Sequence, residues 1–383
     1  MFFRVSAGAL LAALALSSCH EPVDDVITPP APKPVVVEAN WAARADSAQA
    51  ALNQNFWAPT DQYYLQNNQG QANFNYWWQA HGLDVLLDGY QRTKVLDYTT
   101  RMQQLQQGTK KKNGNTYLNT YYDDMAWQAL ANLRAFQLTQ DQSYKATAQL
   151  LWADLKTGWN TNQGGGIAWR KTQLDYKNTP ANAPVAILAA RLYQLDRNPD
   201  DLAWAQKIYD WQKKTLVDPT TGFVWDGVNA NGDGQTNKTW RFTYNQGVYL
   251  GAGLELYRAT QQSSYLDDAT RTAGFVLNDS QLSPGGILHD EGGGDGGLFK
   301  GILVRYLALL ATEPAVPATT RANYVSFLKF NAESLYRKAT RRPQFLFNTD
   351  WTTQPGGTID GSTQLSGVMM FEVMADLQAR KLL

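Results

Sequence analysis

Residues 108–138 read GTKKKNGNTYLNTYYDDMAWQALANLRAFQL, a polar, aromatic-rich loop followed by a helical pattern. Within residues 125–138 apolar side chains recur every three or four positions, which is the period of an amphipathic helix. The segment 113–133 contains no Lys or Arg, so the adjacent pair Asp123 and Asp124 has no local counter-ion. The stretch therefore predicts a helix that opens with two unneutralised carboxylates.

The same succession of helical segments and long loops runs through the rest of the chain. The alternation of apolar and polar residues that is typical of a strand is confined to residues 222–225 and 345–347. The long loops recur about every 50–60 residues and separate pairs of helices. Helical hairpins with long loops at one end are typical of a toroid of inner and outer helices, so we expect an all-α (α/α)6 barrel in one domain. The eleven segments with helical periodicity are 41–56, 83–102, 125–138, 144–155, 183–195, 202–216, 248–260, 265–277, 299–311, 322–336 and 365–382. The long loops are 108–122, 159–179, 222–244, 283–297 and 342–361.

The N-terminus has the pattern of a bacterial lipoprotein signal. A short basic start is followed by apolar residues 5–16, and Leu16-Ser17-Ser18-Cys19 then matches a lipobox. The apolar run is too short for a membrane-spanning helix with stop-transfer flanks. We therefore expect residues 1–18 to be a signal peptide and Cys19 to be the lipidated N-terminus, although a chance hydrophobic leader remains the alternative.

Residues 19–37 are expected to tether the folded domain, residues 38–383, to a membrane. The run Thr28-Pro29-Pro30-Ala31-Pro32-Lys33-Pro34 favours extended polyproline II. The predicted location is the cell envelope, with membrane attachment only through the lipid. A formal net charge of zero gives no field that favours nucleic acid, and it is typical of a monomer.

Composition narrows the chemistry further. Cys19 is the only cysteine, so the domain after it has no disulfide, thiolate ligand or cysteine nucleophile. The three histidines, His20, His81 and His289, form no closely spaced ligand pair, and we expect neither a metal nor a cofactor. The chain has 13 Trp and 12% aromatic residues; most should fill the core, but some suit the flat C–H faces of sugars.

Four adjacent Asp pairs occur, and three have ordinary explanations. The pair at 24–25 lies in the tether, the pair at 200–201 begins a helix, and the pair at 267–268 precedes Arg271 at ion-pair spacing. The remaining pair, Asp123 and Asp124, could also cap a helix start. Among aromatics and without a counter-ion, however, one carboxyl should have a raised pKa while the other stays ionised. Neighbouring carboxyls also suit the short separation that a retaining glycosidase needs.

Polar and aromatic clusters at other helix starts supply candidate sugar-binding residues. Residues 75–84 contain the aromatic and polar side chains of a possible subsite, the glycine run 164–166 leads into a Trp, and residues 243–247 offer a phenol and two amides. The glycine run lacks the strand and Gly-Lys-Ser/Thr of a phosphate loop. Residues 229–234 resemble the start of a calcium loop, but the twelfth position is Trp240 rather than a bidentate Glu, which argues against calcium. The candidates are Trp78, His81, Trp127, Trp169, Tyr244, Asn245 and Gln246.

Six sequence blocks in order resemble glycoside hydrolase family 76, the endo-α-1,6-mannanases, and the likeness runs from about residue 41 to residue 382. The blocks are Trp78-Gln79-Ala80-His81, Tyr122-Asp123-Asp124-Met125-Ala126-Trp127, Gly164-Gly165-Gly166-Ile167-Ala168-Trp169, Asn178-Thr179-Pro180-Ala181-Asn182-Ala183, Thr243-Tyr244-Asn245-Gln246-Gly247 and Phe299-Lys300-Gly301. The resemblance implies an (α/α)6 barrel that hydrolyses α-1,6-mannan with retention, with Asp123 as the nucleophile and Asp124 as the general acid/base.

Two other functions fit much of the same sequence. A non-catalytic outer-membrane lipoprotein that binds glycans would also be helical and rich in Trp, but it would not need an unneutralised Asp pair. A transglycosidase on the same fold would differ only in whether water or a sugar hydroxyl reaches the intermediate. The expected partner in each case is an α-mannan oligo- or polysaccharide.

Overall fold

The computed structural model describes residues 39–383, and Asn40–Leu383 form one compact unit. The predicted signal peptide, the lipidated Cys19 and the tether over residues 19–37 lie outside the described residues. Within residues 39–383 no helix has both the length and the apolar character needed to cross a membrane.

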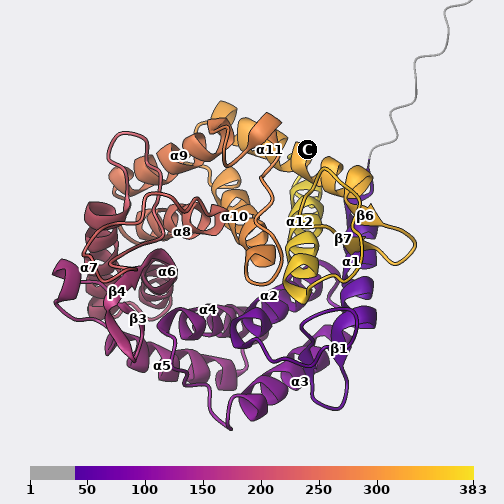
Figure 1. Ribbon diagram of the computed structural model, residues 1–383, viewed down its shortest axis with the longest axis horizontal. Coiled ribbons are helices and arrows are strands. Elements are labelled where there is room, and N and C mark those ends of the chain that lie inside the picture. Colours follow the sequence, from indigo (N-terminus) through magenta and orange to yellow (C-terminus); the bar gives the residue numbers. More distant parts are fainter. Residues whose placement is uncertain (1–38) are drawn as a thin grey trace, which may run out of the picture. The chain divides into compact units, whose positions relative to one another are not determined.

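Twelve α-helices within the described residues form two concentric rings (Figure 1). The chain alternates between the rings, and α2 contacts both α4 and α12, which closes the inner one. The (α/α)6 barrel predicted from the sequence is thereby confirmed. The inner ring consists of α2 (Tyr76–Thr93), α4 (Tyr122–Thr139), α6 (Thr179–Asp196), α8 (Thr243–Thr260), α10 (Gly296–Ala311) and α12 (Gly361–Ala379). The outer ring consists of α1 (Trp41–Phe56), α3 (Asp97–Lys112), α5 (Gln142–Lys156), α7 (Pro199–Leu216), α9 (Ser263–Asn278) and α11 (Ala318–Lys338).

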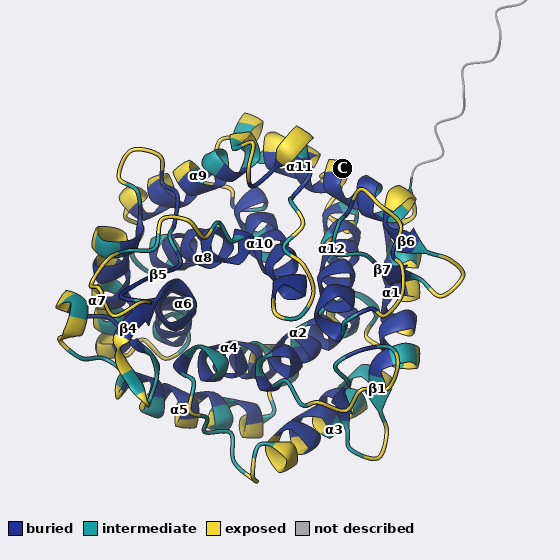
Figure 2. Cartoon of the chain, in the orientation of Figure 1, coloured by how far each residue is buried: buried dark blue, intermediate teal, exposed yellow. Residues whose placement is uncertain are grey.

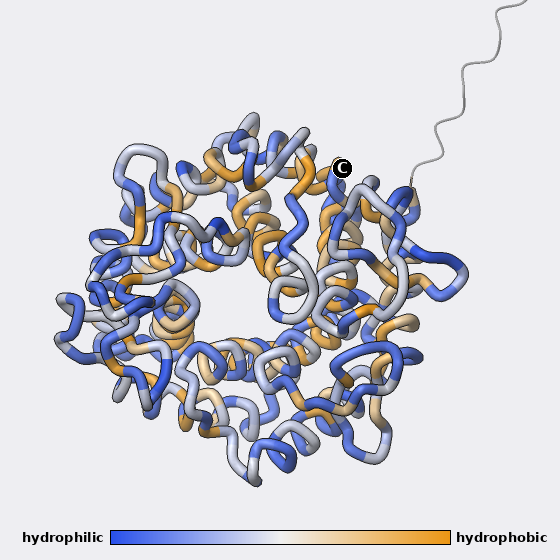
Figure 3. The backbone as a smooth tube through the Cα atoms, viewed as in Figure 1, coloured by the Kyte–Doolittle hydropathy of each residue, from blue (hydrophilic) through white to orange (hydrophobic). Residues whose placement is uncertain are grey.

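The inner helices are buried along almost their whole length, whereas each outer helix exposes one face to solvent (Figure 2). Hydrophobic residues accordingly gather on the inner ring and between the two rings (Figure 3). Glycines allow some inner helices to pack closely. A Cβ atom at Gly247 would lie 2.6 Å from the Cα of Leu303, and one at Gly301 would lie 2.7 Å from the Cα of Ser366. These two positions bring α8, α10 and α12 together.

Short antiparallel strands lie in the loops between helices. The largest sheet has the order β3-β4-β5, and Tyr121, just before α4, forms a bridge with Arg170 in β3. This contact fixes the sheet against the start of α4. The strands are β1 (Trp57–Ala58), β2 (Tyr63–Tyr64), β3 (Ala168–Arg170), β4 (Gln173–Asn178), β5 (Gly227–Val228), β6 (Thr340–Arg341) and β7 (Leu346–Phe347).

Two local expectations differ from the structure. The predicted helix over residues 83–102 is two helices, because Lys94 adopts the left-handed conformation that ends α2. The apolar pattern had continued across the turn through Val95 and Leu96, which are in fact exposed. The strand expected at 345–347 corresponds to β7, but at 222–225 only Val224 forms a single bridge, and the three-stranded sheet was not predicted.

Candidate active site

A cleft of about 870 Å³ opens at the end of the barrel where the inner helices begin. Residues from the first turns of five inner helices line it, together with side chains from the β3-β4-β5 sheet and from the long loops. A volume of this size accommodates a ligand of several hundred daltons. The five helix-start residues are Tyr76, Asp123, Pro180, Tyr244 and Phe299.

Asp123 and Asp124 occupy the first turn of α4 and face this cleft. The Oδ1 atom of Asp123 accepts a hydrogen bond from the backbone N–H of Asp124 at 3.0 Å. Its Oδ2 atom accepts one from the indole Nε1 of Trp169, also at 3.0 Å. Within residues 39–383 the carboxyl group of Asp124 has no hydrogen-bond partner, so the two acids lie in different environments.

The pKa values of both carboxyls are raised. Burial raises the pKa of Asp123 to about 7, although the hydrogen bonds from the Asp124 backbone and from Trp169 lower it. Burial also raises the pKa of Asp124 well above its ordinary value, and the charges of Asp123 and Asp295 raise it further. The sequence had led us to expect one ordinary carboxylate. Enclosure in the cleft instead raises both pKa values, and for Asp124 the charges of Asp123 and Asp295 act in the same direction as burial.

A third carboxylate, Asp226, is buried beside the pair and accepts three hydrogen bonds. Tyr176 donates its hydroxyl to Oδ2 at 2.8 Å, while the Tyr244 hydroxyl and the Asn245 amide donate to Oδ1 at 3.2 and 3.0 Å. Burial raises the pKa of Asp226, and these hydrogen bonds act against that shift. Asp226 thus fixes the side chains of β4 and α8 that form one wall of the cleft.

A fourth carboxylate, Asp295, lies at the start of α10 and lines the opposite side. Its Oδ1 atom accepts hydrogen bonds from the indole nitrogens of both Trp77 and Trp78, each at 3.0 Å. The loop that carries Asp295 is fixed in turn, because the backbone N–H of Gly294 donates to Asp360 at 2.7 Å. Asp295 therefore holds two tryptophans of α2 and itself lines the cleft.

Aromatic rings cover much of the cleft wall. The Trp169 ring packs edge-on against Tyr121 and Tyr176, with centroids 5.2 and 5.6 Å apart. Tyr244, which shares Asp226 with Tyr176, stacks on Phe299 with centroids 3.9 Å apart. Flat apolar rings beside hydrogen-bonding carboxylates suit a ligand that has both C–H faces and hydroxyl groups.

The structure brings five of the nine predicted catalytic and binding residues into the cleft and places four behind it. Trp78 is buried, and its indole nitrogen donates a hydrogen bond to Asp295. Asn245 is also buried, and its amide donates a hydrogen bond to Asp226. The lining residues are Asp123, Asp124, Trp127, Trp169 and Tyr244. The four behind the wall are Trp78, His81, Asn245 and Gln246.

Gln246 and His81 each contact the wall from the barrel side. The amide of Gln246 exchanges two hydrogen bonds with the backbone of Val224, each of 2.8 Å, and so holds the segment that leads to Asp226. The imidazole of His81 packs against Trp77 and Trp127 at centroid distances of 5.4 and 5.0 Å. Burial lowers the pKa of His81 to about 4, so the ring is neutral near pH 7.

Sequence reasoning assigned no role to Asp226, Asp295 or Tyr176. Asp226 follows directly on the segment 222–225 that drew attention as a strand, and Asp295 lies in a glycine-rich stretch before an inner helix. Position before a helix start was an available signal for Asp295, which directly precedes α10, but Asp226 precedes strand β5 and offered no such signal. Asn229, in the calcium-like stretch, uses its side chain within the protein, donating to Asp175 at 3.0 Å and accepting from Gly234 at 2.7 Å.

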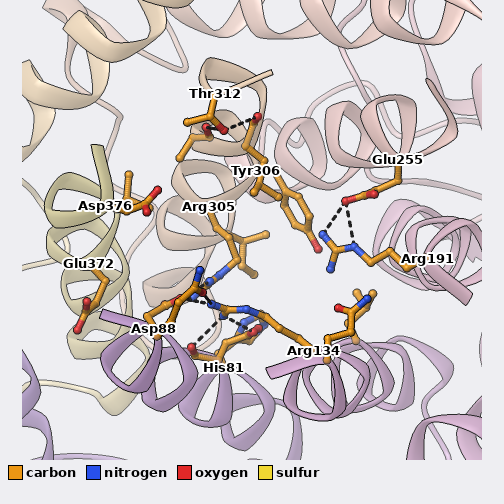
Figure 4. A pocket seen from close by; sticks show the side chains of 18 of the residues that line it. His81, Asp88, Arg134, Arg191, Glu255, Arg305, Tyr306, Thr312, Glu372 and Asp376 are labelled. Carbon is orange, nitrogen blue, oxygen red and sulfur yellow. Dashed lines mark hydrogen bonds and ion pairs between the residues drawn. The ribbon is translucent and has the colours of Figure 1, made fainter. Parts of the chain in front are cut away.

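A second pocket of about 570 Å³ lies at the other end of the barrel, where the inner helices end (Figure 4). Charged side chains from all six inner helices meet there, and the arginines are paired with acids. Arg134 and Arg305 both bind Asp88, while Arg191 binds Glu255 at 2.9 Å. This pocket thus connects the helices by ion pairs, in contrast to the unneutralised carboxyls of the cleft. Among residues 39–383 no group of three or more His, Cys, Asp or Glu could hold a metal ion.

The fold and site together define a class of enzyme. An (α/α)6 barrel whose cleft holds two desolvated, adjacent carboxyls between aromatic walls has the arrangement of a glycoside hydrolase. Residues 40–381 match glycosyl hydrolase family 76, and the chain belongs to that family.

Solved structures and curated sequences agree with this membership. The α-1,6-mannanase of Salegentibacter sp. HEL1_6 superposes with a TM-score of 0.86 at 46% identity, over 88% of this chain and all of that one. A family 76 mannosidase of Bacteroides thetaiotaomicron, at 20% identity and a TM-score of 0.78, shares the fold. Mannan endo-1,6-alpha-mannosidase of Candida glabrata is 28% identical over 283 residues, which cover 67% of this chain and 62% of that protein. The chain thus spans about three fifths of that fungal relative.

Proposed function

We propose that this protein hydrolyses α-1,6-mannosidic linkages in mannan by a retaining double displacement, with Asp123 as nucleophile and Asp124 as general acid/base. The observation that carries the proposal is the pair of neighbouring carboxyls in the cleft, of which only Asp123 receives a side-chain hydrogen bond. Inactive variants of the Salegentibacter enzyme, with two adjacent aspartates replaced, are known in complex with α-1,6-mannotriose and α-1,6-mannotetrose. This supports both the substrate class and the paired acids.

The roles follow from the two environments. Because Trp169 stabilises the ionised form of Asp123, the shared proton belongs on Asp124. In the first step Asp124 gives this proton to the glycosidic oxygen as the C1–O bond breaks, and the Asp123 carboxylate bonds to C1. In the second step Asp124 takes a proton from water, the water oxygen bonds to C1, and the C1–Asp123 bond breaks. The sugar leaves with its original anomeric configuration.

The test is release of reducing ends from debranched α-1,6-mannan by the purified protein. We expect Asp123→Asn and Asp124→Asn each to lower kcat by at least about a thousandfold while mannotriose still binds. Asp200→Asn is the matched control, because Asp200 also lies in the first turn of a helix but is exposed on the outer ring. Wild-type rates in both active-site variants would refute the assignment of the pair.

Two further measurements separate the alternatives. Proton NMR of the first product should show the α-anomer, and an initial β-anomer would exclude retention. If the wild-type protein binds mannan without releasing any reducing ends, it is a glycan-binding protein rather than a hydrolase.

The proposed cellular location is the cell envelope, with Cys19 carrying the lipid. The lipobox before Cys19 and the proline-rich residues after it support this location. Expressed in a bacterium, the full chain should fractionate with membranes, and Cys19→Ala should release it or leave the signal uncleaved. Incorporation of labelled palmitate into both proteins, or into neither, would contradict lipid anchoring.

A further inference from the structure

A strip of four aromatic side chains leads from the interior of the cleft to its rim. Centroids lie 3.9 Å apart for Tyr244 and Phe299, 5.9 Å for Tyr244 and Phe242, and 6.0 Å for Phe242 and Trp240. Phe242 has an extended backbone, so the side chains two residues apart before α8 point the same way. Exposure rises along this aromatic strip, from 8% at Tyr244 to 42% at Trp240.

Trp240, at the outer end, is held in place by its neighbours in sequence rather than by burial of its ring. The side chain of Asn237 accepts hydrogen bonds from the backbone N–H groups of Thr239 and Trp240, at 2.9 and 3.1 Å. On the other side, Arg241 donates to Asp279 at 3.0 Å. Trp240 is the one exposed tryptophan of residues 39–383, and its indole nitrogen has no partner among them. The backbone that carries the indole is therefore held in place, and the ring itself is open to a ligand.

The strip is connected to one member of the acid pair. Asp123 accepts a hydrogen bond from Trp169, and the Trp169 ring contacts Tyr176. Tyr176 donates a hydrogen bond to Asp226. Asp226 also accepts a hydrogen bond from Tyr244, the inner end of the strip. These contacts join the inner end of the strip to the wall that carries Asp123, and Trp240 lines the same cleft at its exposed end.

We propose that Trp240 is an outer sugar-binding platform, on which a mannose unit of a long chain stacks several units away from the bond that is cleaved. The inference rests on the proposed function and deepens it, because it names a residue that favours long chains over short oligosaccharides. A short oligosaccharide that fills the interior does not reach Trp240 and gains nothing from it. Stacking on one ring corresponds to about a three- to tenfold gain in affinity.

The experiment compares kcat/KM on debranched polymeric α-1,6-mannan with kcat/KM on α-1,6-mannotriose. We expect Trp240→Ala to lower the ratio of the two about three- to tenfold, mainly through KM, and Trp240→Phe to restore most of it. The control is Phe330→Ala, which removes another exposed aromatic ring, from outer helix α11, and should leave the ratio unchanged. An unchanged ratio in Trp240→Ala would overturn the proposal.

Calorimetry on the Asp123→Asn/Asp124→Asn double variant separates this inference from the hydrolysis itself. The double variant should bind the polymer more tightly than the same protein carrying Trp240→Ala, whether or not the wild type cleaves mannan. If the wild type does not cleave but this difference is present, hydrolysis is wrong and the platform stands. Equal binding with and without Trp240, or no binding of the polymer at all, would overturn the platform.

Discussion

The indole Nε1 of Trp169 lies 3.0 Å from Oδ2 of Asp123 and donates a hydrogen bond to it. This bond favours the ionised form of Asp123 and opposes the effect of burial, which raises the pKa to about 7. Asp124 receives no comparable donor within the described residues, and Asp123 and Asp295 both raise its pKa. The backbone N–H of Asp124 and the indole of Trp169 thus distinguish two chemically identical neighbours.

Replacing that indole should shift the pH profile of the reaction. The nucleophile must be ionised, so the acidic limb of kcat/KM reports the pKa of Asp123 and is expected near pH 7. In Trp169→Phe the stabilising hydrogen bond is lost, the pKa of Asp123 rises, and the acidic limb should move up by about one pH unit. A pH–rate series on mannan checks this, with Trp204→Phe on outer helix α7 as the control. A limb that stays in place, or moves to lower pH, would contradict the role of Trp169.

The same raised pKa values predict a pH-dependent gain in stability when the pair is neutralised. The folded state holds protons that the unfolded chain releases from about pH 4 upward, so stability falls as pH rises through about 7. The Asp124 carboxyl stays protonated in the folded protein but ionises in the unfolded chain, which favours unfolding at high pH. Asp124→Asn removes this ionisation, and we expect its Tm to exceed the wild-type Tm by about 2 °C or more at pH 8. At pH 4 both wild-type carboxyls are protonated and the gain should vanish.

Thermal melts of wild type and Asp124→Asn at pH 4 and pH 8 measure this difference. Asp200→Asn, exposed at the start of α7, should show no pH-dependent gain. A gain of the same size at both pH values would mean that the substitution acts through packing rather than through the charge of the pair.

The sequence predicted the barrel well because its evidence is local. Amphipathic periodicity defines each helix from its own residues, and the prediction failed at 83–102 where the apolar pattern crossed a turn at Lys94. The acid pair was also a local signal, since it lacks a counter-ion within its own segment. The contacts that give the pair its chemistry are not local. Trp169 lies 46 residues from Asp123, and Asp295 lies 218 residues from Trp77.

Which residue of a cluster faces the cleft could not be predicted from its position at a helix start. Successive helical residues point about 100° apart, so only one or two of each cluster can face the ligand. Thus Tyr244 lines the cleft while Asn245 and Gln246 turn to Asp226 and Val224. The same rotation places Trp77 in the wall and Trp78 behind it.

His81 provides a test of this distinction between lining and supporting residues. It is 3% exposed, and neither ring nitrogen has a hydrogen-bond partner within residues 39–383. An apolar ring of similar size should therefore be tolerated. We expect His81→Phe to keep kcat/KM within about threefold of wild type and to be as stable or about 1 kcal/mol more stable. His81→Ala should lose about 2–4 kcal/mol, because it leaves a cavity against Trp77 and Trp127.

Urea unfolding of the two variants measures their stability, and titration with mannotriose measures whether they still bind the sugar. If His81→Phe folds normally but no longer binds mannotriose, the imidazole contacts the sugar directly, as the sequence had suggested.

Asp88, at the centre of the second pocket, should matter for stability and not for chemistry. Burial raises the pKa of Asp88, but the charges of Arg134 and Arg305 outweigh it and lower the pKa to about 2. The folded pKa lies below the unfolded value, so the resulting stability is present above about pH 4 and is lost as pH falls toward 2. Asp88→Ala leaves both guanidinium groups without their shared acid and should destabilise the protein by about 3–5 kcal/mol at pH 7.

Urea unfolding of Asp88→Ala at pH 7 and pH 3 measures this loss, which should shrink at the lower pH. The control Asp376→Ala breaks an exposed pair with Arg380, where both side chains are about half exposed, and should cost less than about 0.5 kcal/mol. Because the cleft lies at the other end of the barrel, folded Asp88→Ala should retain wild-type kcat on mannan. A variant that is stable but inactive would instead show that Asp88 orders the inner helices up to the acid pair, through α2 and α4.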